Sequence, residues 1–209
     1  MFPSVRSSVG RLVSLALALG AAACGDLNGA PAMTPDNGGQ PGTPAPNAAC
    51  PSLGGLKPPA VPAQLEPPAG ATLMLRYRAE GTQIYTCKAT EGAATGFAWS
   101  FKAPQATLLD DGCKPVGTHF AGPTWKLNAD ESAVIGAKAA EAPSPSPNSI
   151  PWLLLKATST NGQGLMTSVV AVQRVDTVGG VAPADQCSAA TVGTELKVPY
   201  TATYYFYKN

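Results

Sequence analysis

Residues 150–180 read IPWLLLKATSTNGQGLMTSVVAVQRVDTVGG. Two runs rich in aliphatic, β-branched and aromatic residues flank a short Asn/Gly segment, which is typical of a β-hairpin. The first run is apolar without a break from Trp152 to Leu155, so both of its faces are expected to be covered. Period two in the second run places Val169 and Ala171 on one face and Arg174 on the other. We therefore predict that this hairpin forms the centre of an all-β domain.

Short strand-like runs also fill the chain on both sides of this hairpin. They are separated by Gly, Pro, Asn and Asp turn signals, and no helical period longer than a turn or two appears among them. Together with the hairpin they make about nine strands and predict a single antiparallel β-sandwich or a closed β-barrel with little helix. The runs outside the hairpin are residues 72–79, 83–89, 97–101, 106–109, 116–125, 132–136 and 197–207.

The first 23 residues are typical of a signal peptide. Arg6 and Arg11 supply positive charge, and the apolar run 12–23 is too short to span a bilayer. The run ends in three alanines before Cys24, which resembles the lipobox of bacterial lipoproteins, although Ala stands where that motif usually has Leu. We expect an exported protein that is anchored to the cell envelope through lipid on Cys24, at the outer membrane or the periplasmic face. If the alanines form an ordinary cleavage site instead, the protein is secreted.

Composition divides the rest of the chain into two parts. Residues 24–49 are rich in Pro, Gly, Asn and Ala without apolar periodicity, and they predict a disordered tether. Residues 50–209 are expected to form the β domain. The Pro-rich residues 51–70 should lie extended across its surface. Trp152 and Leu154 are expected on one face of the hairpin and Leu153 and Leu155 on the other. Either this Pro-rich segment or a second sheet must therefore cover the outer face.

Four cysteines follow Cys24, and their even number in an exported chain predicts two disulfides. Three pairings are possible, of which we favour Cys87 with Cys187 and Cys50 with Cys113. No two cysteines have Cys-x-x-Cys spacing and the chain contains one histidine, so we expect neither a metal site nor a cofactor. The formal net charge is +1, which gives no basis for electrostatic binding of nucleic acid.

Five segments of the chain together resemble the DUF3455 family, a domain of unknown function in exported bacterial and fungal proteins. The resemblance runs from about Leu65 to Tyr207 in order, and it implies an exported single domain but no activity and no site residues. The segments are Gly81–Cys87, Phe97–Pro104, Gly117–Trp125, Ile150–Leu155 and Gln173–Gly180, and Cys187 and Val198–Tyr200 complete the pattern.

His119 is the strongest candidate for catalysis because it is the one histidine in the chain. Asp110 and Asp111, in the preceding turn, can orient it or share a metal with it. The alternative is a strand histidine that is hydrogen-bonded below the bend at Gly122 and Pro123. The two acids are then ordinary solvated turn residues.

Aromatic residues and one arginine are the candidates for ligand binding. Trp99, Trp125, Trp152 and Tyr85 can line a small-molecule pocket or, alternatively, fill the core. Arg174 can hold an anion, or it can form a structural pair with Asp176 or Glu80.

These residues support two functional hypotheses. The first is a non-catalytic binding or structural module of the cell envelope, whose ligand is a small molecule or a protein. The second is an extracytoplasmic enzyme of hydrolase type that uses His119 with a nearby carboxylate.

The anchoring hypothesis predicts the effect of Cys24→Ser. The variant lacks the thiol that accepts lipid, so it is expected to move from the membrane fraction to the soluble fraction of cell lysates. Fractionation and immunoblotting of parent and variant measure this change. Equal membrane association of the two proteins would contradict a lipid anchor on Cys24.

Overall fold

The computed structural model describes residues 54–92 and 95–209. The predicted signal peptide, Cys24, the tether and Cys50 lie outside the described residues. Two short 3-10 helices occur in the described part, and no helix there is long and apolar enough to cross a membrane. The elements are η1 (Ala63–Leu65), β1 (Thr72–Ala89), β2 (Phe97–Leu109), β3 (Pro115–Phe120), β4 (Thr124–Leu127), β5 (Ala133–Ala142), β6 (Trp152–Asn161), η2 (Leu165–Ser168), β7 (Val169–Gly179) and β8 (Glu195–Lys208).

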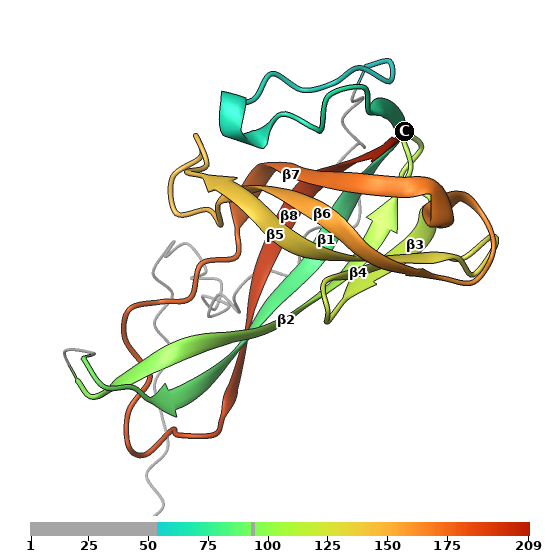
Figure 1. The fold of residues 1–209 in the computed structure, drawn as a ribbon. Coiled ribbons are helices and arrows are strands. Elements are labelled where there is room, and N and C mark those ends of the chain that lie inside the picture. The colour runs from blue at the N-terminus through green and yellow to red at the C-terminus, as the bar shows by residue number, and fades with distance from the viewer. Residues whose placement is uncertain (1–53, 93–94) are drawn as a thin grey trace, which may run out of the picture. The chain divides into compact units, whose positions relative to one another are not determined.

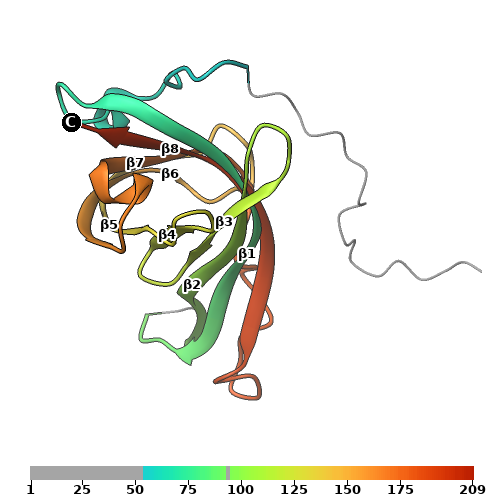
Figure 2. The same cartoon turned by 90° about the vertical axis from the view of Figure 1, so that its right-hand side faces the viewer.

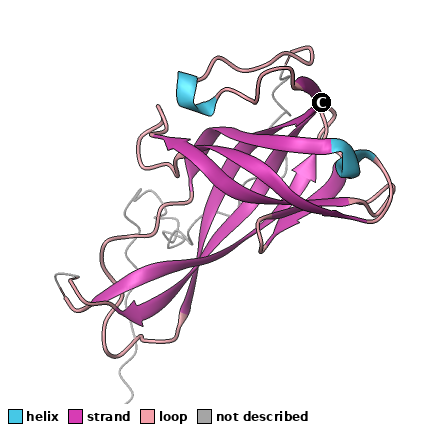
Figure 3. Cartoon of the chain, viewed as in Figure 1, coloured by secondary structure: helices cyan, strands magenta, loops and turns pink. Residues whose placement is uncertain are grey.

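Each strand pairs antiparallel with the next, and β1 also pairs with β8, so the sheet closes into a barrel (Figures 1 and 3). The all-β prediction is confirmed, and of its two alternatives the closed barrel is the one observed. Closure gives each strand a neighbour on both sides within the barrel wall, which removes most of the exposed edges that make open sheets prone to aggregation. Within the described chain, the part of β2 before Ala106 pairs with β1 alone.

The barrel has eight strands where the sequence predicted about nine. Gly81, which separates the predicted runs 72–79 and 83–89, lies inside β1, and β2 likewise joins two predicted runs. The strand needs glycine there because a Cβ would lie 2.1 Å from the Gln105 carbonyl oxygen. Conversely, the predicted run 116–125 is divided into β3 and β4 by a turn.

The predicted central hairpin is present as β6 and β7, with Leu153 opposite Arg174 and Leu155 opposite Val172. One part of its predicted register is wrong. A β-bulge between Val169 and Ala171 shifts the alternation. Val169 therefore lies in the interior core, while Ala171 belongs to the cluster on the outer face.

The Pro-rich segment 54–71 covers the outer face of the hairpin, as one of the two alternatives predicted. Trp152 and Leu154 pack in an outer cluster that also includes Val61 from this segment. The η1 turn lies against β5 and β6, and the Gln173 side-chain Nε2 donates a hydrogen bond of 2.6 Å to the Leu65 carbonyl. The segment is therefore part of the folded domain.

The two ends of the barrel differ. At the closed end, where β1 begins, the interior is filled by side chains of the main core, including Leu127, Val134 and Phe206. Met166 of η2 is fully buried there. The open end is bordered by the β1–β2, β3–β4, β5–β6 and β7–β8 connections, and β1, β2 and β8 extend beyond the other strands on this side (Figures 1 and 2).

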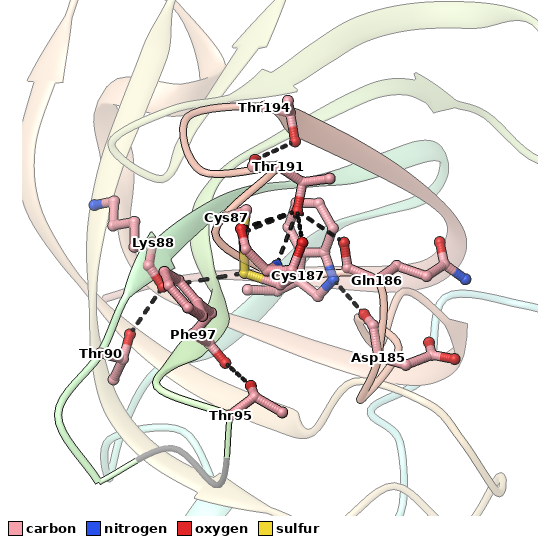
Figure 4. The surroundings of a disulfide bond; sticks show 12 residues. Cys87, Lys88, Thr90, Thr95, Phe97, Asp185, Gln186, Cys187, Thr191 and Thr194 are labelled. Atoms are coloured by element: carbon pink, nitrogen blue, oxygen red, sulfur yellow. Dashed lines mark hydrogen bonds between the residues drawn. A yellow bond between two sulfur atoms is a disulfide. The ribbon is translucent and has the colours of Figure 1, made fainter.

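A disulfide joins Cys87 of β1 to Cys187 of the β7–β8 connection, which confirms one of the predicted pairs (Figure 4). The connection is ordered around it by hydrogen bonds. The Thr191 hydroxyl accepts one from the Ser188 amide and donates one to the Gln186 carbonyl. The second predicted pair includes Cys50, which lies outside the described residues.

The role of segment 54–71 generates a prediction for two of its leucines. Leu65 is 0% exposed and Leu56 is 54% exposed. Leu65→Ala is expected to lower the free energy of unfolding by about 2–5 kcal/mol, because it removes buried methyl groups and leaves a cavity. The matched change Leu56→Ala should alter it by less than about 0.5 kcal/mol. Denaturant melts of both variants measure this, and a neutral Leu65→Ala would show that the barrel does not depend on its cover.

Candidate ligand cavity at the open end of the barrel

The interior of the barrel is hollow at its open end. The open-end cavity has a volume of about 660 Å³, and its walls come from β1 to β8 and the β3–β4 and β5–β6 connections. The residues that line it are mostly aromatic or aliphatic: Tyr85, Phe101, Pro104, Pro123, Trp125, Ile150, Pro151, Leu153, Leu155 and Tyr204. Its polar lining residues are Gln83, Lys102, His119, Lys138, Glu141 and Arg174.

Strand alternation and register explain why three of these side chains are neighbours. Arg174 of β7 is opposite Leu153 of β6 on one side and Tyr204 of β8 on the other. Cross-strand partners in an antiparallel sheet point to the same face. That face is the barrel interior, because Tyr204 belongs to the main core. The sheet therefore places one arginine on an otherwise apolar inner wall.

His119 lies in the cavity wall, 2% exposed, and its ring is stacked on Trp125 with 4.5 Å between ring centroids. Tyr204 contacts it edge-on at 5.0 Å. The Nδ1 atom is 2.8 Å from the Thr124 carbonyl oxygen, which can only accept a hydrogen bond, so Nδ1 carries the proton and Nε2 is an acceptor. Burial lowers the pKa of His119 to about 3, and the positive charge of Arg174 also lowers it. The imidazole is therefore neutral at neutral pH.

Arg174 has no carboxylate partner within residues 54–92 and 95–209. Its Nε and Nη2 donate hydrogen bonds of 3.1 and 2.8 Å to the Pro151 carbonyl oxygen. The predicted pairing with Glu80 is not observed, because Glu80 pairs with Arg78 at 3.2 Å. No ion pair to Asp176 is formed either.

The other charges at the cavity are compensated. Lys138 pairs with Glu141 at 2.7 Å, and Lys102 pairs with Glu195. The charge of Arg174 acts on the buried tyrosines instead: burial raises the pKa of Tyr204, and the nearby guanidinium opposes that rise. Arg174 is thus the cation in the cavity wall that lacks an acidic partner among the described residues.

Asp110 and Asp111 lie at the closed end, at the other end of β3 from His119. Asp111 accepts hydrogen bonds of 2.7 Å from the Arg76 guanidinium. Asp110 accepts hydrogen bonds from the backbone amides of Gly112 and Lys114, which shape the β2–β3 turn. The structure therefore does not bring either acid to His119.

Of the three candidate tryptophans, Trp125 lines the cavity. Trp99 lies on β2, and its Nε1 donates a hydrogen bond of 2.9 Å to the Asp185 carbonyl of the β7–β8 connection. Trp152 packs in the outer cluster. The structure thus brings together His119, Trp125, Arg174 and Tyr85, all of which were predicted from the sequence.

The comparison of this chain with known proteins identifies its family. The model of a family described as "Protein of unknown function (DUF3455)" matches residues 68–208. The chain belongs to the DUF3455 family. This DUF3455 domain matches no curated protein and no solved structure.

Two buried donors of this DUF3455 domain belong to cavity residues and have no hydrogen-bond partner in the described part of the chain. They are Trp125 Nε1 and Gln83 Nε2. Leaving such a donor unpaired costs about 1–3 kcal/mol. Together with Arg174, which lacks an acidic partner there, they give this wall several polar groups without a full set of partners, and such groups call for an explanation such as a ligand. Unsatisfied groups of the described chain also occur away from the cavity, at Arg78 Nη1 and Trp152 Nε1. No group of three or more His, Cys, Asp or Glu side chains that could hold a metal occurs among the described residues.

The sequence analysis missed Gln83, Phe101, Leu153 and Tyr204 as cavity residues. Gln83 carried a detectable signal, since period two places a polar residue on the same face as Tyr85. The others are apolar and did not differ from core residues in the sequence.

The neutral, buried His119 generates a prediction for the DUF3455 domain. The unfolded chain gains a proton at pKa 6.5 but the folded chain only at about 3. Stability is therefore complete above pH 6.5 and is lost as pH falls towards 3. Between about pH 6.5 and pH 5 the free energy of unfolding should fall by about 1.6 kcal/mol, because the slope is half of about 1.36 kcal/mol per pH unit at pH 6.5 and approaches that value near pH 5. Urea melts across this range measure the slope.

His119→Gln is the control for this slope. The variant has no group that titrates near pH 6, so its stability should be nearly constant over the same range, whatever its absolute value. Equal slopes in the parent and the variant would contradict a buried, neutral histidine.

Proposed function

We propose that this domain is a non-catalytic module that binds a small, largely apolar organic molecule in the open-end cavity. The observation that carries the proposal is a closed eight-stranded barrel that is packed at one end and hollow at the other, with a cavity of about 660 Å³. Barrels of eight strands are wide enough to hold one small ligand. Ligand pockets typically have this size and a mostly apolar lining with a few polar groups.

The surroundings of His119 favour binding over hydrolysis. A histidine that acts as a general base needs a pKa near the working pH and a group that orients it. The pKa of His119 is near 3, and the orienting group is the Thr124 carbonyl. Asp110 and Asp111 make their hydrogen bonds at the other end of the barrel. This geometry supports His119 as part of the cavity wall.

We further propose that the module acts at the cell envelope of the exporting cell, held there by lipid on Cys24. The signal-like first 23 residues and the alanines before Cys24 support this proposal. The Cys87–Cys187 disulfide is also what an exported domain is expected to contain.

A neutral fluorescent probe, N-phenyl-1-naphthylamine, tests the cavity. Its emission should rise when it enters the apolar interior. Leu153→Trp puts a larger side chain into the cavity and should weaken probe binding by at least about tenfold, or 1.4 kcal/mol. The matched control is Leu165→Trp, which adds the same indole at a 50% exposed position in η2 at the closed end.

The two variants separate cavity binding from surface binding. If the probe binds with the same affinity to the parent and both variants, it does not occupy the open-end cavity. If the parent does not bind the probe at all, the cavity is not an apolar ligand site and the proposal fails.

A further inference from the structure

The open-end cavity contains one group that an apolar ligand alone does not explain. Arg174 presents a guanidinium to a wall formed by Leu153 and Tyr204, and the described chain supplies no carboxylate for it. A buried or half-buried charge without a partner is costly. A charged side chain in such a position is therefore expected to receive its opposite charge from a ligand or from another chain.

The hydrogen bonds of Arg174 leave part of its donor set available. Pro151 takes Nε and one hydrogen of Nη2 through a single carbonyl oxygen. A guanidinium has five N–H groups, so both hydrogens of Nη1 and the second hydrogen of Nη2 are not taken by Pro151, and the Tyr204 hydroxyl is their neighbour in the protein. These hydrogens lie on the end-on edge of the group, which matches the two oxygens of a carboxylate in a bidentate pair. The tether to Pro151 also holds the side chain in place, which lowers the entropic cost of pairing.

The remaining charges at the cavity leave a positive charge at this wall, which favours an anion. Glu141, the one acid that lines the cavity, is paired with Lys138. Lys102 is a further cation of the lining, and its partner Glu195 does not line the cavity. Burial also keeps the hydroxyl of Tyr204 protonated, because it raises the pKa of that group. A protonated hydroxyl beside the guanidinium can donate a further hydrogen bond to an anion.

We infer that the ligand of the open-end cavity is an organic carboxylate with an apolar body, bound with its carboxylate on Arg174. The apolar body lies among Tyr85, Phe101, Leu153 and Leu155, which line the same cavity. Phe101 is 54% exposed at the mouth and lies 5.7 Å from Tyr85 in an edge-on arrangement, so an aromatic body can pack against the two rings. This inference rests on the proposed binding function.

Two probes of the same shape and different charge test the inference. 2-Naphthoate and 2-naphthylmethanol share an apolar body, but only the first carries a carboxylate. Each is titrated against the N-phenyl-1-naphthylamine complex at neutral pH and its affinity is obtained from displacement. The parent is expected to bind 2-naphthoate at least about tenfold more tightly than 2-naphthylmethanol, because hydrogen bonds between charged groups are stronger than those to a neutral group.

Arg174→Gln should remove this preference by weakening 2-naphthoate, while the affinity for 2-naphthylmethanol stays within about twofold. The matched control is Arg78→Gln, which changes another strand arginine, one that is paired with Glu80 and does not line the cavity. It should keep the parent's preference.

The outcomes distinguish this inference from the proposed function. Equal affinity of the parent for both probes overturns the carboxylate inference and leaves apolar binding intact. A preference that persists in Arg174→Gln overturns the role of Arg174. The parent comparison does not depend on any variant folding, and failure of the parent to bind either probe overturns the inference directly.

Discussion

Pairing between the first and last strands is the constraint on which the rest of this structure depends. β1 and β8 are paired from Thr72 opposite Lys208 to Thr86 opposite Glu195. This seam turns a meander of consecutive hairpins into a closed barrel, and closure makes one face of every strand an interior face. Each strand therefore has one face in the barrel interior and one face outside. The interior is a packed core at one end of the barrel and a cavity at the other.

The outer face of β6 and β7 shows the same constraint from the opposite side. The hairpin is apolar on both faces, so closing the barrel leaves Trp152 and Leu154 in need of cover. The Pro-rich segment supplies it, and the hydrogen bond from Gln173 to the Leu65 carbonyl satisfies a polar side chain that is almost fully buried. Proline suits this role because an extended segment without regular hydrogen bonds can follow a curved surface.

Local pattern was sufficient to predict the strands, the hairpin and the need for an outer cover, since each depends on period two and on turn residues. It was not sufficient where a contact with a residue far away in the sequence decides where a strand ends or which face a side chain takes. Gly81 reads as a strand break, but it is a close approach to Gln105 on the neighbouring strand. The bulge between Val169 and Ala171 likewise puts these two residues on opposite faces, and nothing in the composition indicates it.

The cavity residues could also be predicted only in part. His119, Trp125 and Arg174 could be chosen from the sequence because their side chains carry recognisable chemistry. Their arrangement in space could not be predicted, because it depends on which strands become neighbours when the barrel closes. Asp110 is close to His119 in the sequence, but β3 separates the two residues by most of its length. Tyr204, far away in the sequence, contacts the imidazole directly.

The Cys87–Cys187 disulfide has a consequence for how the barrel can open. It ties β1 to the residues that lead into β8, so it bridges the seam at the open end, and the covalent loop it closes spans 100 residues and contains β2 to β7. While it is intact, the ends of β1 and β8 at the mouth of the cavity cannot separate far from each other. The Thr72 and Lys208 side of the seam has no such restraint in the part of the chain that the structure describes. Opening of the barrel between β1 and β8 is therefore less costly at the packed end than at the mouth, and the disulfide keeps these two walls of the cavity together when the opposite end of the seam frays.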